Sequence, residues 1–210
     1  RASEQRVSQL LEEKELLLRE VHHRVKNNMS VIASILSLQA ETLEDSNARE
    51  ALADARSRVH SMMILYERLY RSDGVSDISL LSYLSPLIDK IIMTFGNAPL
   101  IRIHKDLDDF VLNARQLFSI GIIVNELITN AMKHAFPDGS RGNVYIQGKR
   151  EEDFVILSVA DDGGCFPEDV AGVLEKGFGL QVVKLMSKQI AADLDVSRGE
   201  MTRFIIRFKK

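Results

Sequence analysis

The 210-residue chain has one cysteine, little net charge and no long apolar run, and each shortage excludes a class of protein. The single cysteine, Cys165, cannot build an internal disulfide framework, which suits a reducing cytoplasm, where we expect the protein. No apolar run approaches the roughly 18 residues that a membrane span needs. The formal net charge of -3 offers no strong field to nucleic acid or to an anionic membrane surface. The sequence therefore predicts a soluble globular protein, without a membrane segment and without nucleic acid as a partner.

The N-terminal part of the sequence has neither glycine nor proline between residues 4 and 42, which predicts one long helix. A mainly apolar seam on this helix repeats with alternating spacings of three and four and comprises Leu18, Val21, Val25, Asn28, Ile32 and Ile35. A second helix is predicted at residues 48–71, after a short polar turn. Two antiparallel helices cannot bury both of their faces alone, so we expect a homodimer in which two hairpins form a four-helix bundle.

The helical pattern breaks at Ser72-Asp73-Gly74, where we place the boundary between two domains, residues 1–74 and 75–210. The second domain mixes elements, with helices predicted at residues 80–95, 114–136 and 180–190, and strands at 101–104, 143–148, 154–159 and 203–208. The interleaving predicts an α+β protein, in which a long helical hairpin precedes an α/β sandwich with helices on one face of a mixed or mostly antiparallel sheet.

Two adjacent histidines, His22 and His23, lie on the first predicted helix. Neighbouring residues on a helix point about 100° apart, so the two side chains cannot face the same way. The seam places His22 on its flank and His23 on the opposite, solvent-facing side. An exposed imidazole keeps a neutral, nucleophilic fraction near neutral pH, which favours His23 as the reactive residue. The alternative is that both are ordinary surface histidines.

The helix predicted at residues 114–136 carries Glu126, Asn130, Lys133 and His134 on one polar face. An amide oxygen is a hard ligand that suits Mg²⁺, and a neighbouring lysine or histidine can neutralise phosphate charge. The alternative is an amphipathic helix whose polar face is simply solvated.

Two glycine-containing loops complete the set of candidate residues. Asp161 and Gly163 follow a predicted strand, where a carboxylate could accept a hydrogen bond from an amine such as that of adenine. Gly177 and Gly179 precede Leu180 and the last helix, whose free backbone N–H groups suit phosphate. Each loop alone is equally consistent with a plain turn.

In their order along the chain, these motifs resemble the catalytic core of bacterial sensor histidine kinases. LLREVHHRVKNN and LYRSDGVSDISLLSYL resemble the HisKA_2 dimerisation and phosphoacceptor domain, which is related to the HWE group. NELITNAMKHAFPDG, DDGGCFP and GFGLQVV resemble the N, G1 and G2 boxes of the GHKL-type ATPase domain, which has the Bergerat fold. The resemblance extends over about residues 15–208.

The resemblance implies that ATP and Mg²⁺ are the cofactors. Residues 1–74 would then be a coiled-coil linker with the dimerisation and histidine phosphotransfer hairpin, and residues 75–210 the ATP-binding catalytic domain. Asn130 would coordinate Mg²⁺, Asp161 would bind the adenine amine, and Lys133 and His134 would lie near the phosphates. Gly177 and Gly179 would shape the phosphate loop and the lid.

The resemblance also implies a reaction and its partners. The acceptor is the histidine followed by Arg-x-x-Asn, which selects His23. ATP-dependent autophosphorylation would give a phosphoramidate, which an aspartate of a response-regulator receiver domain would accept in two-component signalling. The chain begins at Arg1 inside a helical pattern, so we expect an upstream sensor domain that is absent from this sequence.

The sequence departs from the family pattern at several positions. Cys165 stands at the second glycine of the G1 box, and a shift of the alignment by one residue would make Asp162 the adenine ligand instead of Asp161. Thr202 stands where glycines are frequent, and we include it among the nucleotide-binding residues. The proton acceptor is open between Glu126 and Glu20. Two alternative functions therefore remain: a degenerate kinase that acts as a nucleotide-modulated scaffold, and a serine kinase of the anti-sigma type.

Overall fold

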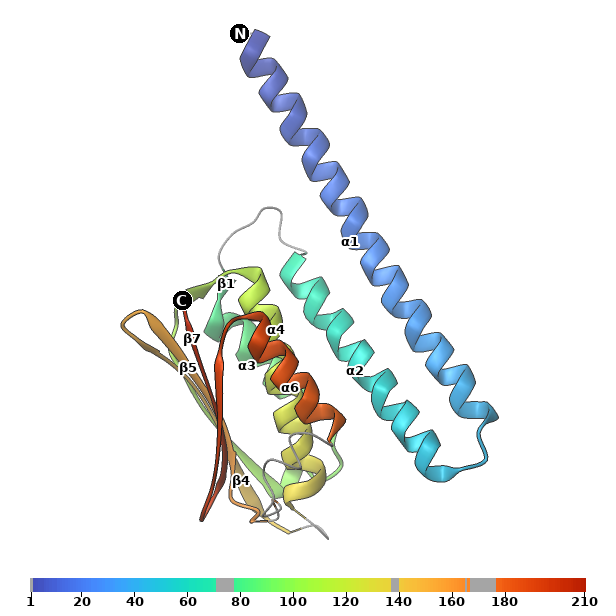
Figure 1. Cartoon of the computed structure of the whole chain (residues 1–210), viewed down its shortest axis with the longest axis vertical. Coiled ribbons are helices and arrows are strands. Elements are labelled where there is room, and N and C mark those ends of the chain that lie inside the picture. Colours follow the sequence, from blue (N-terminus) through green and yellow to red (C-terminus); the bar gives the residue numbers. More distant parts are fainter. Residues whose placement is uncertain (1, 71–77, 137–139, 165, 167–176) are drawn as a thin grey trace. The chain divides into compact units, whose positions relative to one another are not determined.

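The computed structural model describes residues 2–70, 78–136, 140–164, 166 and 177–210. The chain divides into two compact units, Arg1–Ser72 and Asp73–Lys210 (Figure 1). The predicted boundary at Ser72-Asp73-Gly74 falls in residues 71–77, which lie outside the described part of the chain. None of the described helices is both long enough and apolar enough to cross a bilayer.

The first unit is a hairpin of two antiparallel helices, α1 (Ala2–Thr42) and α2 (Ser46–Tyr70) (Figure 1). Polar side chains join the helices along their length. The Nδ1 atom of His22 lies 2.6 Å from the hydroxyl of Tyr66, and Arg56 donates to the hydroxyl of Ser37 at 3.2 Å. The helices thus meet along a stripe that contains His22 and Ser37.

Apart from Val25, which is partly buried, the predicted apolar seam lies on a different face of α1 from the one that α2 covers. Val21 is 51% exposed, and Ile32 and Ile35 are each 48% exposed. Residues about 100° further around the helix, such as His22 and Ala33, are partly buried instead. Helix α1 therefore has two stripes, one that packs on α2 and one that α2 leaves uncovered.

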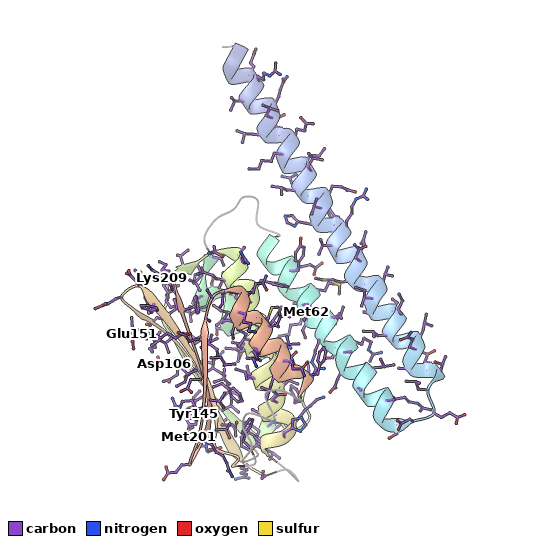
Figure 2. The ribbon with its side chains drawn as sticks, viewed as in Figure 1. Met62, Asp106, Tyr145, Glu151, Met201 and Lys209 are labelled. Atoms are coloured by element: carbon purple, nitrogen blue, oxygen red, sulfur yellow. The ribbon has the colours of Figure 1, made fainter. Side chains whose placement is uncertain are left out.

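The second unit is built on a five-stranded sheet with the order β2-β4-β5-β7-β6. The strands are β2 (Ile101–Leu107), β4 (Gly142–Glu151), β5 (Phe154–Asp161), β6 (Asp193–Arg198) and β7 (Thr202–Lys209). Strands β2 and β4 are parallel, and the other neighbours are antiparallel. Tyr145 and Met201 lie toward one end of this sheet, and Glu151 and Lys209 lie toward the other (Figure 2).

Helices α3 (Leu80–Ile92), α4 (Ala114–Asn130) and α6 (Phe178–Gln189) cover one face of the sheet (Figure 1). A short 3-10 turn, η1 (Ala98–Leu100), precedes β2, and a two-stranded ribbon pairs β1 (Ile78–Ser79) with β3 (Val111–Leu112). The predicted α+β fold, a helical hairpin followed by an α/β sandwich, is confirmed.

The core forms between the helices and the covered face of the sheet. Alternate strand residues point into it, as expected for a sheet with one covered face. They pack against apolar residues of α3 and α4, and the largest of the fully buried side chains include Phe208, Leu84, Ile88, Ile123, Leu127 and Ile146. This core fixes α4 and the ends of β5 and β7 relative to one another.

Several details differ from the sequence-based expectation, and three of them concern the longer elements. Strand β6 was not predicted, because its sequence DLDVSR alternates apolar residues with exposed charged ones and has little hydrophobic signal. Helix α3 ends at Ile92 rather than at residue 95. The helix predicted to reach residue 136 changes at Asn130 into a π-helical turn, η2 (Ala131–Ala135).

We predict that Leu84→Ala lowers the free energy of unfolding of the second unit by about 2–5 kcal/mol, because it leaves a cavity in the core. Leu84 is 0% exposed, whereas Leu81 on the same helix is 39% exposed. Urea unfolding of both alanine variants measures the difference. An equal loss in Leu81→Ala would contradict this view of the core.

Candidate functional site

A pocket of about 380 Å³ opens in the second unit where α4, η2, β5, β7 and the start of α6 meet. The structure brings most of the predicted nucleotide residues together in its lining, namely Asn130, His134, Asp161, Gly177, Gly179, Leu180 and Thr202. These residues come from four separate segments of the sequence. Their convergence makes this pocket the candidate functional site.

The helical wall of the pocket comes from α4 and its continuation η2. Leu127, Asn130, Ala131 and His134 line it at the spacing of one helix face. The side chain of Asn97 donates a hydrogen bond of 2.9 Å to the carbonyl oxygen of Met132 and so braces the π-helical turn from outside. Such turns frequently occur at functional sites.

Two of the predicted residues on this helix are not part of the lining. Lys133 is exposed on η2, one residue before His134. Glu126 is only 1% exposed within α4, so its carboxyl group is buried in the unit. A carboxyl group buried in this way is poorly accessible to a residue outside the pocket, so its burial does not favour Glu126 as the proton acceptor.

The sheet contributes Asp161, the last residue of β5, which pairs with Thr202 at the start of β7. Asp161 is 8% exposed, and its Oδ1 atom accepts a hydrogen bond from the backbone N–H of Gly163 at 3.2 Å. Burial raises the pKa of the Asp161 carboxyl group, the Gly163 hydrogen bond opposes this, and the charge of Asp162 adds to the rise. The carboxylate therefore lies in the pocket with little water around it.

Asp162 lies in a different environment from Asp161. It is exposed and is not part of the pocket lining. Its two carboxylate oxygens accept hydrogen bonds from Asn143, one from the backbone N–H at 2.7 Å and one from the side-chain amide at 2.6 Å. Of the two aspartates considered as ligands, Asp161 is the one whose side chain faces the pocket.

Gly163 allows the loop after β5 to approach η2 closely. A Cβ atom at this position would lie 2.0 Å from the carbonyl oxygen of Ala135, a distance that no side chain can occupy. The next residue, Gly164, has a φ of +69°, in the left-handed region that favours glycine. Both glycines of the predicted G1 motif are thus explained by the path of the backbone.

The opposite side of the pocket is the start of α6. Gly177 precedes the helix, and Gly179 and Leu180 lie in its first turn and line the pocket. Backbone N–H groups at a helix start are not all used within the helix, and the helix dipole is positive there. Cys165 and residues 167–176 lie outside the described residues.

Sequence reasoning missed the apolar part of the pocket. The additional lining residues are Leu127, Ala131, Ala135, Val159, Phe166 and Phe204. The rings of Phe166 and Phe204 meet edge to face with centroids 5.6 Å apart. Periodicity could have identified several of them, because Val159 alternates with Asp161 on β5 and Leu127 lies one turn before Asn130 on α4.

The two histidines of α1 differ in their surroundings. His23 is exposed. His22 is half-buried, bonds to the hydroxyl of Tyr66 and packs its ring edge-on to the tyrosine ring with centroids 5.5 Å apart. Burial, together with the neighbouring His23, lowers the pKa of His22. Glu20, one turn before His23, accepts a hydrogen bond of 2.7 Å from Arg24.

Known protein families match both units of the chain. The family model described as histidine kinase (HisKA_2) matches residues 20–95, and the model described as histidine kinase-, DNA gyrase B- and HSP90-like ATPase (HATPase_c) matches residues 118–210. The chain thus combines a histidine kinase segment with an ATPase-type segment of the kind found in histidine kinases, DNA gyrase B and HSP90. The chain belongs to the histidine kinase family, and the resemblance seen in the sequence is confirmed.

Individual relatives agree with this family. Sensor histidine kinase PdtaS from Mycobacterium tuberculosis is 31% identical over 189 residues, which cover 89% of this chain and 36% of the relative. PdtaS from Mycolicibacterium smegmatis is 33% identical over 191 residues, covering 89% and 37%. The chain thus spans just over a third of the length of these curated relatives.

Among solved structures, the histidine kinase domain of the EL346 blue-light activated histidine kinase from Erythrobacter litoralis matches with a TM-score of 0.66 and 25% identity. The match covers 94% of this chain and 92% of that domain. It therefore includes both the hairpin and the sandwich.

We predict that Asp161→Asn raises the melting temperature of the nucleotide-free protein at pH 7 by a few degrees. Because burial raises the pKa of this carboxyl group above its ordinary value of 3.8, its stabilising protonated form is lost as pH rises through the raised pKa. The gain should vanish below about pH 4, where both side chains are neutral. Differential scanning calorimetry against pH measures it. The exposed Asp193→Asn is the control, and a gain that did not depend on pH would contradict the argument.

Proposed function

We propose that this chain is the catalytic core of a sensor histidine kinase that binds ATP with Mg²⁺ and phosphorylates its own His23. An aspartate of a response-regulator receiver domain then accepts the phosphoryl group. The observation that carries the proposal is the pocket, which gathers a buried carboxylate, an amide, an imidazole and a glycine-flanked helix start. The family assignment of both units supports the same reaction.

Adenine recognition is assigned to the part of the pocket around Asp161. The Asp161 carboxylate accepts a hydrogen bond from the exocyclic amine, and this bond compensates for the burial of its charge. Apolar side chains, including Val159 and Phe204, cover the faces of the base. Thr202, buried beside Asp161 on the neighbouring strand, offers a hydroxyl group on the same side.

The phosphates are assigned to the part of the pocket between η2 and α6. The helix start at Gly177 and Gly179 offers backbone N–H groups to phosphate oxygens. His134 lies in the lining, and Lys133 beside it adds positive charge at the rim. Both groups offset charge on the phosphoryl group as it leaves.

Mg²⁺ fits the donor set at Asn130. The amide oxygen of Asn130 is a hard ligand in the pocket lining, and Mg²⁺ usually takes one or two protein ligands while phosphates and water complete its shell. The ion would supply charge neutralisation and fix the orientation of the phosphates. Asn130 is the last residue of α4.

His23 is proposed as the acceptor because it is exposed on α1, while His22 is bonded to Tyr66. A neutral imidazole nitrogen attacks the γ-phosphorus, the bond to ADP breaks, and the N–H proton of the ring leaves to a base. Of the two candidates for that base, Glu20 is favoured over Glu126. Glu20 is exposed one turn from His23, whereas Glu126 is buried in the other unit.

The uncovered stripe of α1 supports a homodimer. The stripe includes Val21, Ile32 and Ile35, all about half exposed within the chain. Their heptad spacing is typical of helices packed side by side. A second copy of the hairpin would bury this stripe and form the four-helix bundle, with His23 on the opposite, outward side.

Incubation of the protein with γ-labelled ATP and Mg²⁺ tests the reaction. We expect acid-labile, base-stable label on the wild type, because phosphohistidine is a phosphoramidate. His23→Gln and Asn130→Ala should lose it by at least about a hundredfold, from removal of the acceptor and of a metal ligand. His22→Gln is the matched control and should keep the label.

Other outcomes identify the alternatives. Label that survives acid would indicate a serine kinase of the anti-sigma type. An unlabelled wild type that gains label on Cys165→Gly would indicate a nucleotide loop compromised at that position. No label in either protein would favour the scaffold alternative and contradict the proposed activity.

The dimer has its own test. We predict that Ile32→Asp raises the dissociation constant of the dimer by at least about tenfold, because it would bury a charge in the seam. Ser34→Asp adds the same charge on the far side of α1, where Ser34 is exposed, and should change little. Analytical ultracentrifugation measures both constants. Equal effects of the two variants would exclude this stripe as the interface.

A further inference from the structure

The loop that follows β5 is attached to the start of β4 by one pair of residues, Asn143 and Asp162. The antiparallel ladder between β4 and β5 ends at the pair Val144 and Asp161. One residue further on, both oxygens of Asp162 accept hydrogen bonds from Asn143, and the backbone N–H of Asp162 donates to the carbonyl oxygen of Asn143 at 3.3 Å. The pair thus continues the strand connection past the end of the sheet.

The Asn143 amide has a second partner on its other side. Its Oδ1 atom lies 3.0 Å from Nε2 of His104 on β2, and the imidazole stacks on the ring of Tyr145 with centroids 4.6 Å apart. Because the Asp162 carboxylate can only accept, the amide nitrogen of Asn143 faces Asp162, and its oxygen then accepts from the Nε2–H tautomer of His104. Figure 2 shows Tyr145 toward the end of the sheet where Met201 lies.

The attached loop and the start of β4 also lie close against the end of η2. A Cβ atom at Gly142 would lie 2.0 Å from the ring of Phe136 and 2.9 Å from Oδ1 of Asp162. A Cβ atom at Gly163 would lie 2.0 Å from the carbonyl oxygen of Ala135. The loop is therefore held between Asn143 on one side and the end of η2 on the other.

We propose that Asn143 and Asp162 form a positioning clamp that holds Asp161 and Gly163 in the geometry needed to bind the nucleotide base. Asp162 takes no part in binding itself. The clamp sets the path of residues 161–163, and along this path the Gly163 N–H reaches Oδ1 of Asp161 and fixes the direction of the carboxylate. The inference rests on the proposed nucleotide function of the pocket.

The clamp can be tested by exchanging its two side chains. In Asn143→Asp two carboxylates face each other, so the side-chain bond is lost. In Asp162→Asn two amide nitrogens face each other as long as His104 donates to the Asn143 oxygen, so the same bond is lost. In the double variant, the amide now at position 162 would donate to the carboxylate now at position 143, while the amide oxygen still accepts from the backbone N–H of residue 143. The exchange restores both hydrogen bonds with the same net charge.

Isothermal titration calorimetry of the full chain with ATP and Mg²⁺ gives the first readout. We expect each single variant to raise the dissociation constant about five- to tenfold, because only part of the free energy of the lost hydrogen bond contributes to holding the binding geometry. The double variant should return to within about twofold of the wild type. If Asp162 were itself the base ligand, the exchange could not restore binding, and losses that simply add would overturn the proposal.

Hydrogen exchange of the Gly163 amide in the nucleotide-free protein, followed by NMR, gives a second readout. We expect faster exchange in both single variants and recovery in the double variant. A wild type that binds no ATP, while Gly163 still responds in this way, would contradict the proposed function and leave the clamp standing. Normal ATP binding with an unchanged Gly163 amide in the single variants would overturn the clamp.

Asp106→Asn is the matched control, because Asp106 on β2 also bonds across the sheet, to Lys149 on β4, and lies away from the Met201 end (Figure 2). It should change neither readout. If Asn143→Asp does not fold, the alanine variants Asn143→Ala and Asp162→Ala replace it in a double-mutant cycle. Additive changes in the ATP dissociation constant across that cycle would equally overturn the proposal.

Discussion

Burial of the Asp161 carboxylate constrains the pocket and the loop that follows β5. A charged group at the end of β5 loses water that the apolar lining, including Val159 and Phe204, does not replace. Without a nucleotide, the Gly163 N–H donates a hydrogen bond to this carboxylate. It reaches Oδ1 because the loop turns closely against the end of η2. The close approach at Ala135, the glycines and the attachment to β4 all follow from the need to keep this one group buried and correctly directed.

The sequence predicted those site residues whose type is set by a single physical requirement. Position 163 requires glycine because the backbone there lies against the backbone of Ala135. Asp161 could be recognised because it places a charged side chain at the end of an apolar strand. The helical spacing of Asn130 and His134 places both on one face, and the structure brings them to the pocket. The fold class followed from the same local signals, because long runs of helical or alternating residues form the two units.

Other features depend on packing that no local pattern records. Helix α1 carries two stripes, and the sequence cannot tell which of them α2 will cover. The change from α4 to the π-helical turn η2 is supported by Asn97, 35 positions before the carbonyl oxygen of Met132 that it binds. Strand β6 is held by its pairing with β7 rather than by its own composition. Asp162 could not be separated from Asp161 until the hydrogen bonds of Asn143 were seen.

The uncovered stripe of α1 has a consequence for how the two units keep their folds. The sandwich buries its apolar residues within one chain, so its stability is a property of that chain. The hairpin leaves Val21, Ile32 and Ile35 about half exposed, and in the proposed homodimer a second molecule would bury them. In a homodimer its folding and assembly are therefore one equilibrium that obeys mass action. Dilution would weaken the hairpin of such a homodimer while leaving the sandwich intact. The concentration of the protein would therefore help to set the stability of the hairpin.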